Sequence, residues 1–487
     1  MFDPFEKDIA AMSEAMAQGK TSAVALVEFY LERILRYDQQ GPCLNAVVTL
    51  NPHVLDAAER LDDERKNGML RSPLHGIPLL LKDNLDTFDL PTTAGSQALK
   101  NNRPATDAFV VHRLRKAGAV ILGKTNLSEF ARHGITVGSL MGQTLNPYDL
   151  TRTPGGSSGG TGAAVAANMA AAGLGTDTVN SVRSPSSANS LVGLRPTTGL
   201  LSRSGIVPNS FTQDTAGPMA RSVQDCQILL ETCMGYDPRD EKTREQLGRS
   251  VLMSPLSYRE NGLQDRKIGL ITTLLGEDPD VKAAVRQSLH ILEDLGGEII
   301  PLDVPEFESA RVIRECDVQL YETKKILNEY FSGIPHCPVK HLDELVAGGL
   351  LHESILPKMK ASAALEDPLQ HPVYRQKLQA IDDVKRLALQ LMAAHQMDVF
   401  FYPHQQILVE PVAQQDQRGR NGILASVMGF PAITVPGGFA SPTQDAVRGV
   451  PIGVEFMARP FEESLLLEIA FLFEQKSQFR QPPLLTP

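Results

Sequence analysis

The chain has 487 residues and a formal net charge of −10, and 42% of its residues are hydrophobic. This length can bury a large core, while the acidic balance argues against nucleic-acid binding, which needs a basic face. No segment approaches the roughly 20 apolar residues that span a bilayer, so no membrane partner is expected. The five cysteines are scattered and the histidines form no ligand motif, which favours a cytoplasmic protein without a metal site.

The N-terminal segment predicts two helices, then a strand and a third helix. Apolar periodicity predicts helices over 5–18 and 23–37, and Thr21 or Ser22 is placed to cap the second. A strand over 46–50 and a charged, amphipathic helix over 52–66 follow.

A short apolar run at 77–81 predicts a buried strand that ends at Lys82. A lysine in this position can extend its amine to solvent or pair with Asp83 or Asp86. The alternative is that the buried amine acts as a base, because a low dielectric disfavours the charged ammonium.

The next segment predicts a helix over 107–117 and a strand over 119–122. Asn126 and Ser128 come directly after this strand, where α/β sheets usually bind their ligands. A structural role for Ser128, as the cap of a helix that begins there, is the other interpretation.

The stretch 152–196 is rich in glycine, serine and alanine, and contains few large side chains. The loop 155–160 reads GGSSGG and leads into a predicted helix over 161–172. A second turn, GTDTVNSVR, places Ser181 24 residues after Ser157. That spacing allows a loop, a helix of about three turns and a return turn, which would bring both serines to one end of a sheet. A serine hydroxyl needs a base before it can act as a nucleophile, and Lys82 is the candidate.

The C-terminal half begins with an irregular connection over 235–265. A βαβ pattern follows, with strands over 267–272 and 298–302 around a helix over 280–295. Residues 305–395 are mostly helical, and we expect them to form the pocket that decides the substrate. The helix over 374–395 leads to a strand over 398–402, and further strands over 432–435 and 452–457 precede a covering helix over 461–475. Asp416 and Arg420 could line a pocket, although a solvated surface is the expected account.

Several motifs in register resemble the amidase signature family of serine hydrolases. They are GIPLLLKDNLD (76–86), LPTTAGS (90–96), GKTNLSEFA (123–131), RTPGGSSGG (152–160), GTDTVNSVR (175–183), GFPAITVP (429–436) and GVPIGVEFMARPFEESLLLEIAFLFEQ (449–475). The resemblance implies an α/β fold, with a central twisted mixed β-sheet flanked by helices on both faces. It implies a single domain over 1–487, made of N-terminal helices (5–37), a signature core (about 70–235), a variable helical pocket region (about 305–395) and a closing sheet and helix (398–476).

The resemblance also implies a Ser–Ser–Lys triad. By position in the motifs, Ser181 is the nucleophile, Ser157 the bridging serine, held in that family by a cis peptide bond, and Lys82 the base. Family precedent assigns the oxyanion hole to backbone N–H groups of Thr178, Val179, Asn180 and Ser181. The resemblance implies no cofactor, and it leaves the substrate-binding residues unknown.

This sequence departs from the family's pattern immediately before the nucleophile, where two glycines are usual and Val179 and Asn180 stand here. A β-branched valine strongly disfavours positive φ, whereas asparagine tolerates it. We therefore predict negative φ at Val179, with any unusual conformation at Asn180. The added bulk and polarity of Asn180 could alter the choice of substrate.

The leading functional hypothesis is an amidohydrolase that cleaves a small carboxamide, anilide or carbamate through an acyl-enzyme on Ser181, with possible esterase activity and a possible homodimer. The alternatives are the glutaminase subunit of a tRNA-dependent amidotransferase, which has the same triad, and a family member impaired by Val179 and Asn180. An α/β-hydrolase is disfavoured, although 155–159 fits GxSxG, because LTRTP before it is a poor strand.

Overall fold

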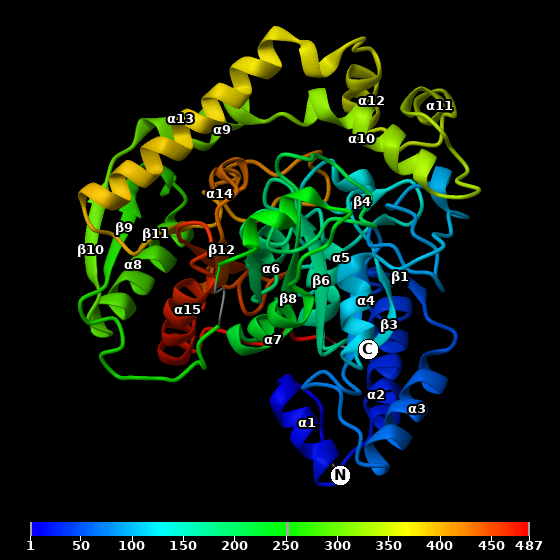
Figure 1. Ribbon diagram of the computed structural model, residues 1–487. Helices are drawn as coiled ribbons and strands as arrows, with labels where there is room; N and C mark the ends of the chain where they lie inside the picture. The colour runs from blue at the N-terminus through cyan, green and yellow to red at the C-terminus, as the bar shows by residue number, and fades with distance from the viewer. Residues whose placement is uncertain (1, 250–252, 486–487) are drawn as a thin grey trace.

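The computed structural model describes residues 2–249 and 253–485, and one sheet of 11 strands runs through it (Figure 1). The strand order is β1-β3-β2-β6-β8-β7-β12-β13-β11-β9-β10. These strands are β1 (Val47–Leu50), β2 (Pro78–Lys82), β3 (Val120–Thr125), β6 (Ala172–Asp177), β7 (Val192–Arg195), β8 (Thr215–Ala220), β9 (Lys267–Ile271), β10 (Glu298–Leu302), β11 (Val399–Pro403), β12 (Ala432–Phe439) and β13 (Pro451–Met457). A separate pair consists of β4 (Val137–Gly138) and β5 (Gly142–Gln143).

The sheet is mixed, as the resemblance implied. β2 pairs in parallel with β3 and β6, and β9 pairs in parallel with β10 and β11, whereas the strands between these groups pair antiparallel. The parallel pair β9 and β10 joined by α8 confirms the predicted βαβ unit. Strands from residue 47 to residue 457 share this one sheet.

Helices cover both faces of the sheet. The helices are α1 (Ile9–Ala17), α2 (Ala23–Ile34), α3 (Val54–Lys66), α4 (Phe109–Lys116), α5 (Gly159–Ala166), α6 (Arg183–Ala188), α7 (Val223–Cys233), α8 (Pro279–Asp294), α9 (Ser309–Cys316), α10 (Gln319–Gly333), α11 (Leu342–Ala347), α12 (Leu356–Ala363), α13 (Pro372–Ala394), α14 (Ile423–Met428) and α15 (Glu463–Ser477). The short helices α5 and α6 contact each other and the central strands, and α4, α7 and α15 form a second packed group.

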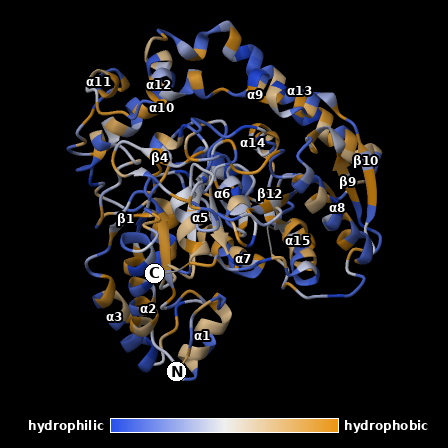
Figure 2. Ribbon diagram, turned by 180° about the vertical axis from the view of Figure 1, so that it is seen from behind, coloured by the Kyte–Doolittle hydropathy of each residue, from blue (hydrophilic) through white to orange (hydrophobic). Residues whose placement is uncertain are grey.

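The helices α9 to α13 form an arch over one end of the sheet, opposite the N-terminal helices α1 to α3 (Figure 1). Hydrophobic residues concentrate on the strands, whereas α13 alternates between hydrophobic and hydrophilic residues (Figure 2). This pattern fits a long helix with one face on the core and one in solvent. No helix among the described residues has the length and apolar content to cross a bilayer.

Most predicted elements are confirmed with small shifts at their ends, but one helix was predicted too long. The run 161–172 was expected to be helical throughout, whereas α5 ends at Ala166 and Ala172 already begins β6. Asn168 has a positive φ of 56°, which closes the helix before the strand begins. Ser22 caps α2, as one of the two candidates. The expected connection over 235–265 is irregular apart from a short 3-10 helix, Glu241–Gln246, and its residues 250–252 lie outside the described residues.

Candidate active site

Lys82 is the last residue of β2, a strand whose residues are all buried between β3 and β6. Its Nζ donates hydrogen bonds to Ser157 Oγ at 2.7 Å and to Thr176 Oγ1 at 2.8 Å. Within the described residues, no carboxylate lies within ion-pair distance of Nζ. Asp83 instead pairs with Lys124 at 3.0 Å. The interpretations in which Lys82 reaches solvent or pairs with a neighbouring aspartate are therefore wrong.

The environment of Lys82 favours an uncharged amine. Burial lowers the pKa of Lys82 to about 7, and the negative charges of Asp177 and Asp214 offset only part of this effect. Near neutral pH, a large share of the molecules therefore carries an amine with a free lone pair. At 2.7 Å, that lone pair can accept the hydroxyl proton of Ser157.

Ser157 and Ser181 belong to two segments that lie against each other. The peptide bond between Gly156 and Ser157 is cis, as the resemblance implied. The next residue, Ser158, donates its N–H to the carbonyl of Ser181 at 3.1 Å. Lys82 and Ser157 are thus in direct contact, and the backbone beside Ser157 holds the turn that carries Ser181. Of these three side chains, that of Ser181 lines a pocket.

The four residues that end at Ser181 have backbone N–H groups without hydrogen-bond acceptors. Residues 178–181 are all buried, with at most 9% of each residue exposed. Yet none of their N–H groups donates a hydrogen bond within the described residues. Because backbone N–H groups inside folded proteins are nearly always paired, these four groups are free to donate to an atom of a bound molecule.

Side chains donate hydrogen bonds to the carbonyl groups of this turn. Arg195 donates to the carbonyl of Asp177 at 2.7 Å, and Gln213 donates to that of Thr178 at 3.4 Å. The carbonyl of Val179 accepts from Arg183 and from Ser426. In a trans peptide the N–H points away from the carbonyl of the preceding residue. The N–H groups of 178–180 therefore point away from the side chains that hold these carbonyls.

A buried ionic network fixes the turn. Arg183 pairs with Asp177 at 3.1 Å and with Glu455 at 2.5 Å, and Arg195 pairs with the same Asp177 at 3.0 Å. The two arginines hold the pKa of Asp177 far below its usual range, although burial alone would raise it. Asp177 and Arg183, which flank Ser181 in the motif GTDTVNSVR, thus form an ion pair. Arg183 is fully buried in this network, so it does not present its charge to a substrate.

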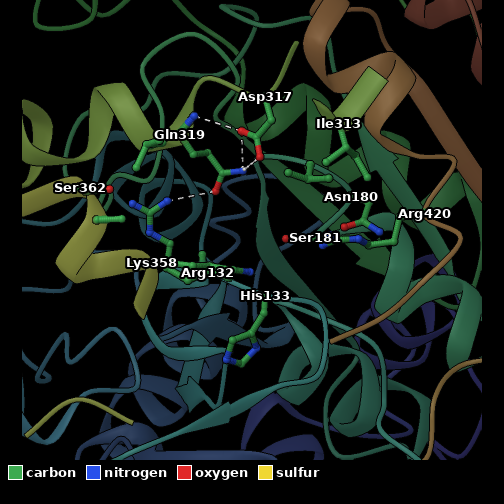
Figure 3. Close-up of a pocket in the computed structure, with 14 residues that line it drawn as sticks. Arg132, His133, Asn180, Ser181, Ile313, Asp317, Gln319, Lys358, Ser362 and Arg420 are labelled. Atoms are coloured by element: carbon green, nitrogen blue, oxygen red, sulfur yellow. Dashed lines mark hydrogen bonds between the residues drawn. The ribbon is translucent and has the colours of Figure 1, made fainter. Parts of the chain in front are cut away.

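A pocket of about 300 Å³ opens beside Ser181 (Figure 3). Its walls come from the loop after β3, from the turn before Ser181, from the α9–α12 region and from the loop before α14. The lining residues are Ala131, Arg132, His133, Val179, Asn180, Ser181, Ile313, Asp317, Gln319, Leu320, Lys358, Ala361, Ser362 and Arg420. The expectation that 305–395 contributes to the pocket is confirmed. Arg420 also lines it, so a solvated surface was the wrong account of that residue.

A second cavity of about 420 Å³ adjoins the site from another side. It contacts Thr176 and Thr178, together with Asn84, which donates to Thr176 Oγ1 at 2.9 Å. Ser181 does not line this cavity. The pocket of about 300 Å³ is therefore the one that places a bound molecule beside the predicted nucleophile.

Comparison with known proteins agrees with this geometry. The family model described as Amidase matches residues 25–467. The chain belongs to the amidase signature family. It is 35% identical to a probable amidase of Arabidopsis thaliana, over 98% of this chain and 91% of the relative. It is 32% identical to a glutamyl-tRNA(Gln) amidotransferase subunit of Thermoanaerobacter pseudethanolicus, over 98% of this chain and 97% of the relative. The crystal structure of the peptide amidase of Stenotrophomonas maltophilia superposes with a TM-score of 0.89, at 37% identity and over the whole of both chains.

In this amidase-family chain, the two residues that replace the usual glycines adopt ordinary backbone angles. Neither Val179 nor Asn180 is among the described non-glycine residues with positive φ. The prediction of negative φ at Val179 is confirmed, and Asn180 needs no unusual conformation either. The departure from the family's pattern therefore changes the side chains at the site while the N–H groups of the turn stay unpaired.

Several residues of this amidase-family site were missed by sequence reasoning. Thr176 binds the amine of Lys82 through its hydroxyl, and Ser426 binds the turn before Ser181 from 245 residues further along the chain. Arg132 and Lys358 line the pocket without belonging to any predicted motif. The position of Thr176 in the motif GTDTVNSVR could have indicated its role. Ser426, Arg132 and Lys358 come close to the site only when the chain folds.

Asn126 and Ser128 have structural roles. Asn126 Nδ2 donates to Thr144 Oγ1 at 3.0 Å, and Ser128 Oγ accepts from the N–H of Thr136 at 2.9 Å. The expected helix cap by the Ser128 side chain is wrong, since its hydroxyl makes no cap bond to the 3-10 helix Glu129–Ala131. No group of three or more metal-ligating side chains is found among the residues that the structure describes.

Proposed function

We propose that the protein hydrolyses the C–N bond of a small carboxamide, anilide or carbamate through an acyl-enzyme on Ser181. The observation that carries this proposal is the contact of 2.7 Å between Ser157 Oγ and the buried amine of Lys82, whose pKa is lowered to about 7. A base of this pKa is half deprotonated near neutral pH, where proton transfer is most efficient.

The reaction begins with two proton transfers. Neutral Lys82 accepts the hydroxyl proton of Ser157, and Ser157 takes the proton of Ser181 as Ser181 Oγ attacks the carbonyl carbon. The carbonyl π electrons move to oxygen, and the resulting oxyanion accepts hydrogen bonds from the N–H groups of Thr178, Val179, Asn180 and Ser181. Removal of one such donor costs on the order of 3 kcal/mol in enzymes of this kind.

The intermediate then collapses. The proton held by Lys82 returns through Ser157 to the leaving nitrogen, the C–N bond breaks, and the amine departs. Water attacks the ester on Ser181 and transfers a proton along the same path, which releases the acid and restores the serine. Every proton taken from Ser181 or water is delivered to the amine or to Ser181, so no cofactor is required. We place this activity in the cytoplasm because the sequence contains five scattered cysteines.

Hydrolysis of a panel of amides, anilides, carbamates and esters tests the proposal. We expect turnover of at least one amide, and its loss in Ser181→Ala. The matched control is Ser441→Ala, which removes an exposed hydroxyl that donates to Asp280. Amide hydrolysis that survives in Ser181→Ala would overturn the assignment of the nucleophile.

A second candidate is the glutaminase subunit of a tRNA-dependent amidotransferase. It is supported by the relatives of 32% identity that are named as glutamyl-tRNA(Gln) amidotransferase subunits. The sequence lacks a DGVRYG-like segment, which argues against it. Glutamine hydrolysis together with co-purification of partner proteins would favour this candidate over a free-standing amidase. A catalytically impaired member is the third outcome, and it requires that no substrate of the panel is hydrolysed.

A further inference from the structure

We propose that the pocket beside Ser181 selects amides that carry a carboxylate, and that Arg132 is the residue that binds this carboxylate. The inference rests on the proposed amide hydrolysis, because it concerns the substrate of the same site. It goes further by naming the chemical group that the substrate must contain.

Arg132 carries a buried charge without a carboxylate partner. It follows the 3-10 helix Glu129–Ala131 and is only 7% exposed. Its guanidinium donates to Gln319 Oε1 at 3.3 Å (Figure 3). It also donates to Thr323 Oγ1, and both acceptors are neutral. Among the described residues, no carboxylate oxygen lies within 4.0 Å of its nitrogens. Burial lowers the pKa of Arg132 to about 10 and the charges of Asp317 and Asp214 oppose this shift, so the group is still charged at neutral pH.

An arginine buried in this way is costly unless an anion compensates it. Removal of a charged group from water costs several kcal/mol in proteins. A well-oriented partner of opposite charge can offset a cost of this size. The guanidinium can bind both oxygens of a carboxylate with two parallel hydrogen bonds. Because Arg132 lines the same pocket as Ser181, a bound substrate is positioned to supply that carboxylate.

The other charged groups around the pocket offset this positive charge only in part. Asp317 and Asp214 attract the guanidinium from more than 4.0 Å away, so neither forms an ion pair with it. Lys358 and Arg420 both lie near a single carboxylate, that of Asp416, at 3.6 and 3.5 Å. The carboxylate of Asp317 accepts hydrogen bonds from Gln319. Three cations thus share two carboxylates. His133 adds no charge near neutral pH, because burial lowers its pKa to about 3.

Asn180 provides a second, independent indication. Its side-chain nitrogen Nδ2 is buried and has no hydrogen-bond acceptor within the described part of the chain, although the residue is only 1% exposed and lines the pocket next to Ser181. An unpaired buried donor costs about 1–3 kcal/mol, which a substrate oxygen would recover. Figure 3 shows Asn180 beside Ser181 and Arg420. The pocket therefore offers a cation and a free donor to a ligand that is rich in acceptors.

The pocket size limits the substrate further. A volume of about 300 Å³ is at the lower end of the range for small-molecule sites. A short monoamide of a dicarboxylic acid meets both requirements, because its amide can reach Ser181 while its carboxylate reaches Arg132. A carboxylate on the amine side of the amide has the same chemistry, so the experiment includes both placements.

Binding to the Ser181→Ala variant tests the inference without turnover. Calorimetry measures the affinity of two pairs of compounds, in each of which a neutral amide replaces the carboxylate of the acid. The pairs are glutaramate with glutaramide, and N-acetylglycine with N-acetylglycinamide. We expect the acid of at least one pair to bind roughly tenfold or more tightly than its neutral amide. This preference should weaken as the salt concentration is raised. Addition of Arg132→Gln should remove the preference, and Arg132→Lys should keep part of it. The control Arg36→Gln, on the half-exposed side chain that pairs with Glu32, should leave it intact.

The outcomes separate this inference from the proposed function. Equal affinity for the acid and the neutral amide in both pairs would overturn the inference, even if Ser181 hydrolyses amides. A preference that persists in Arg132→Gln would overturn the role of Arg132. If the wild-type protein hydrolyses no amide while the preference is present and depends on Arg132, the proposed function fails and the carboxylate site stands.

Discussion

Arg183 donates a hydrogen bond of 3.0 Å to the carbonyl of Val179, from inside a network in which it also pairs with Asp177 and Glu455. Ser426 Oγ donates to the same carbonyl at 2.6 Å. Together they fix the peptide plane between Val179 and Asn180, so that the N–H of Asn180 faces away from them. Two side chains distant in sequence thereby orient a donor of the proposed oxyanion hole.

Ser426→Ala should lower kcat by roughly tenfold with little change in KM, because a less well oriented donor matters most when the oxyanion forms. Steady-state kinetics on any hydrolysed amide measures this. The Ser441→Ala control should keep the wild-type kcat. A Ser426→Ala enzyme with unchanged kcat would show that this hydrogen bond does not position the turn.

The rate should depend on the protonation of Lys82. Since burial lowers its pKa to about 7, kcat/KM should rise with pH through about 7 and then level off as the amine becomes neutral. Lys82→Ala should reduce kcat/KM by roughly 10²–10⁴ and flatten this limb. The measurement is a pH–rate profile of both proteins. If kcat/KM of Lys82→Ala still rises through about pH 7 as in the wild type, the titrating group is not Lys82.

Lys82 should also destabilise the fold. Its folded pKa of about 7 lies below its ordinary value of 10.5, so the unfolded state binds more protons between these values. The loss in free energy of unfolding is at its maximum below about pH 7, and it declines by about 1.4 kcal/mol per pH unit toward pH 10.5. Lys82→Met should therefore have a higher Tm than the wild type, with a difference that is larger at pH 6.5 than at pH 9.5. A difference that grows with pH would contradict the lowered pKa.

Close backbone packing at the start of α5 should make Gly160 irreplaceable. A Cβ at Gly160 would lie 2.3 Å from the carbonyl oxygen and 2.6 Å from the backbone nitrogen of Asn126. Because these are backbone atoms, Gly160→Ala should destabilise the protein by about 3 kcal/mol or more. The control is Gly333→Ala at the end of α10, where a Cβ would meet no atom within 4 Å. Denaturant unfolding compares the two, and equal stabilities would refute the packing argument.

The sequence predicted the local features of the site well. The apolar run before Lys82 indicated a buried strand, and the Gly/Ser loop and the second turn indicated where the two serines would lie. These inferences depended on neighbouring residues in the chain, whose periodicity and turn chemistry are visible directly. The mixed character of the sheet came from the family resemblance, because nothing local fixes which strands pair.

The sequence did not predict the residues that determine the chemistry of the pocket. Arg132, Gln319 and Lys358 lie in different parts of the chain and meet only in the folded protein. Asp83 forms its ion pair with Lys124 and not with Lys82, which depends on the register of β2 and β3. The helix after Gly160 was predicted too long because alanine favours helix, whereas Ala172 is held in the parallel ladder between β6 and β2.

Labelling with a fluorophosphonate tests the central claim most directly, because the probe forms a bond only with an activated hydroxyl. After digestion, mass spectrometry should find the adduct on the peptide that contains Ser181, with labelling lost in Ser181→Ala and strongly slowed in Lys82→Ala. Ser441→Ala should label as the wild type does. An adduct on another residue, or undiminished labelling of Ser181→Ala, would contradict the account.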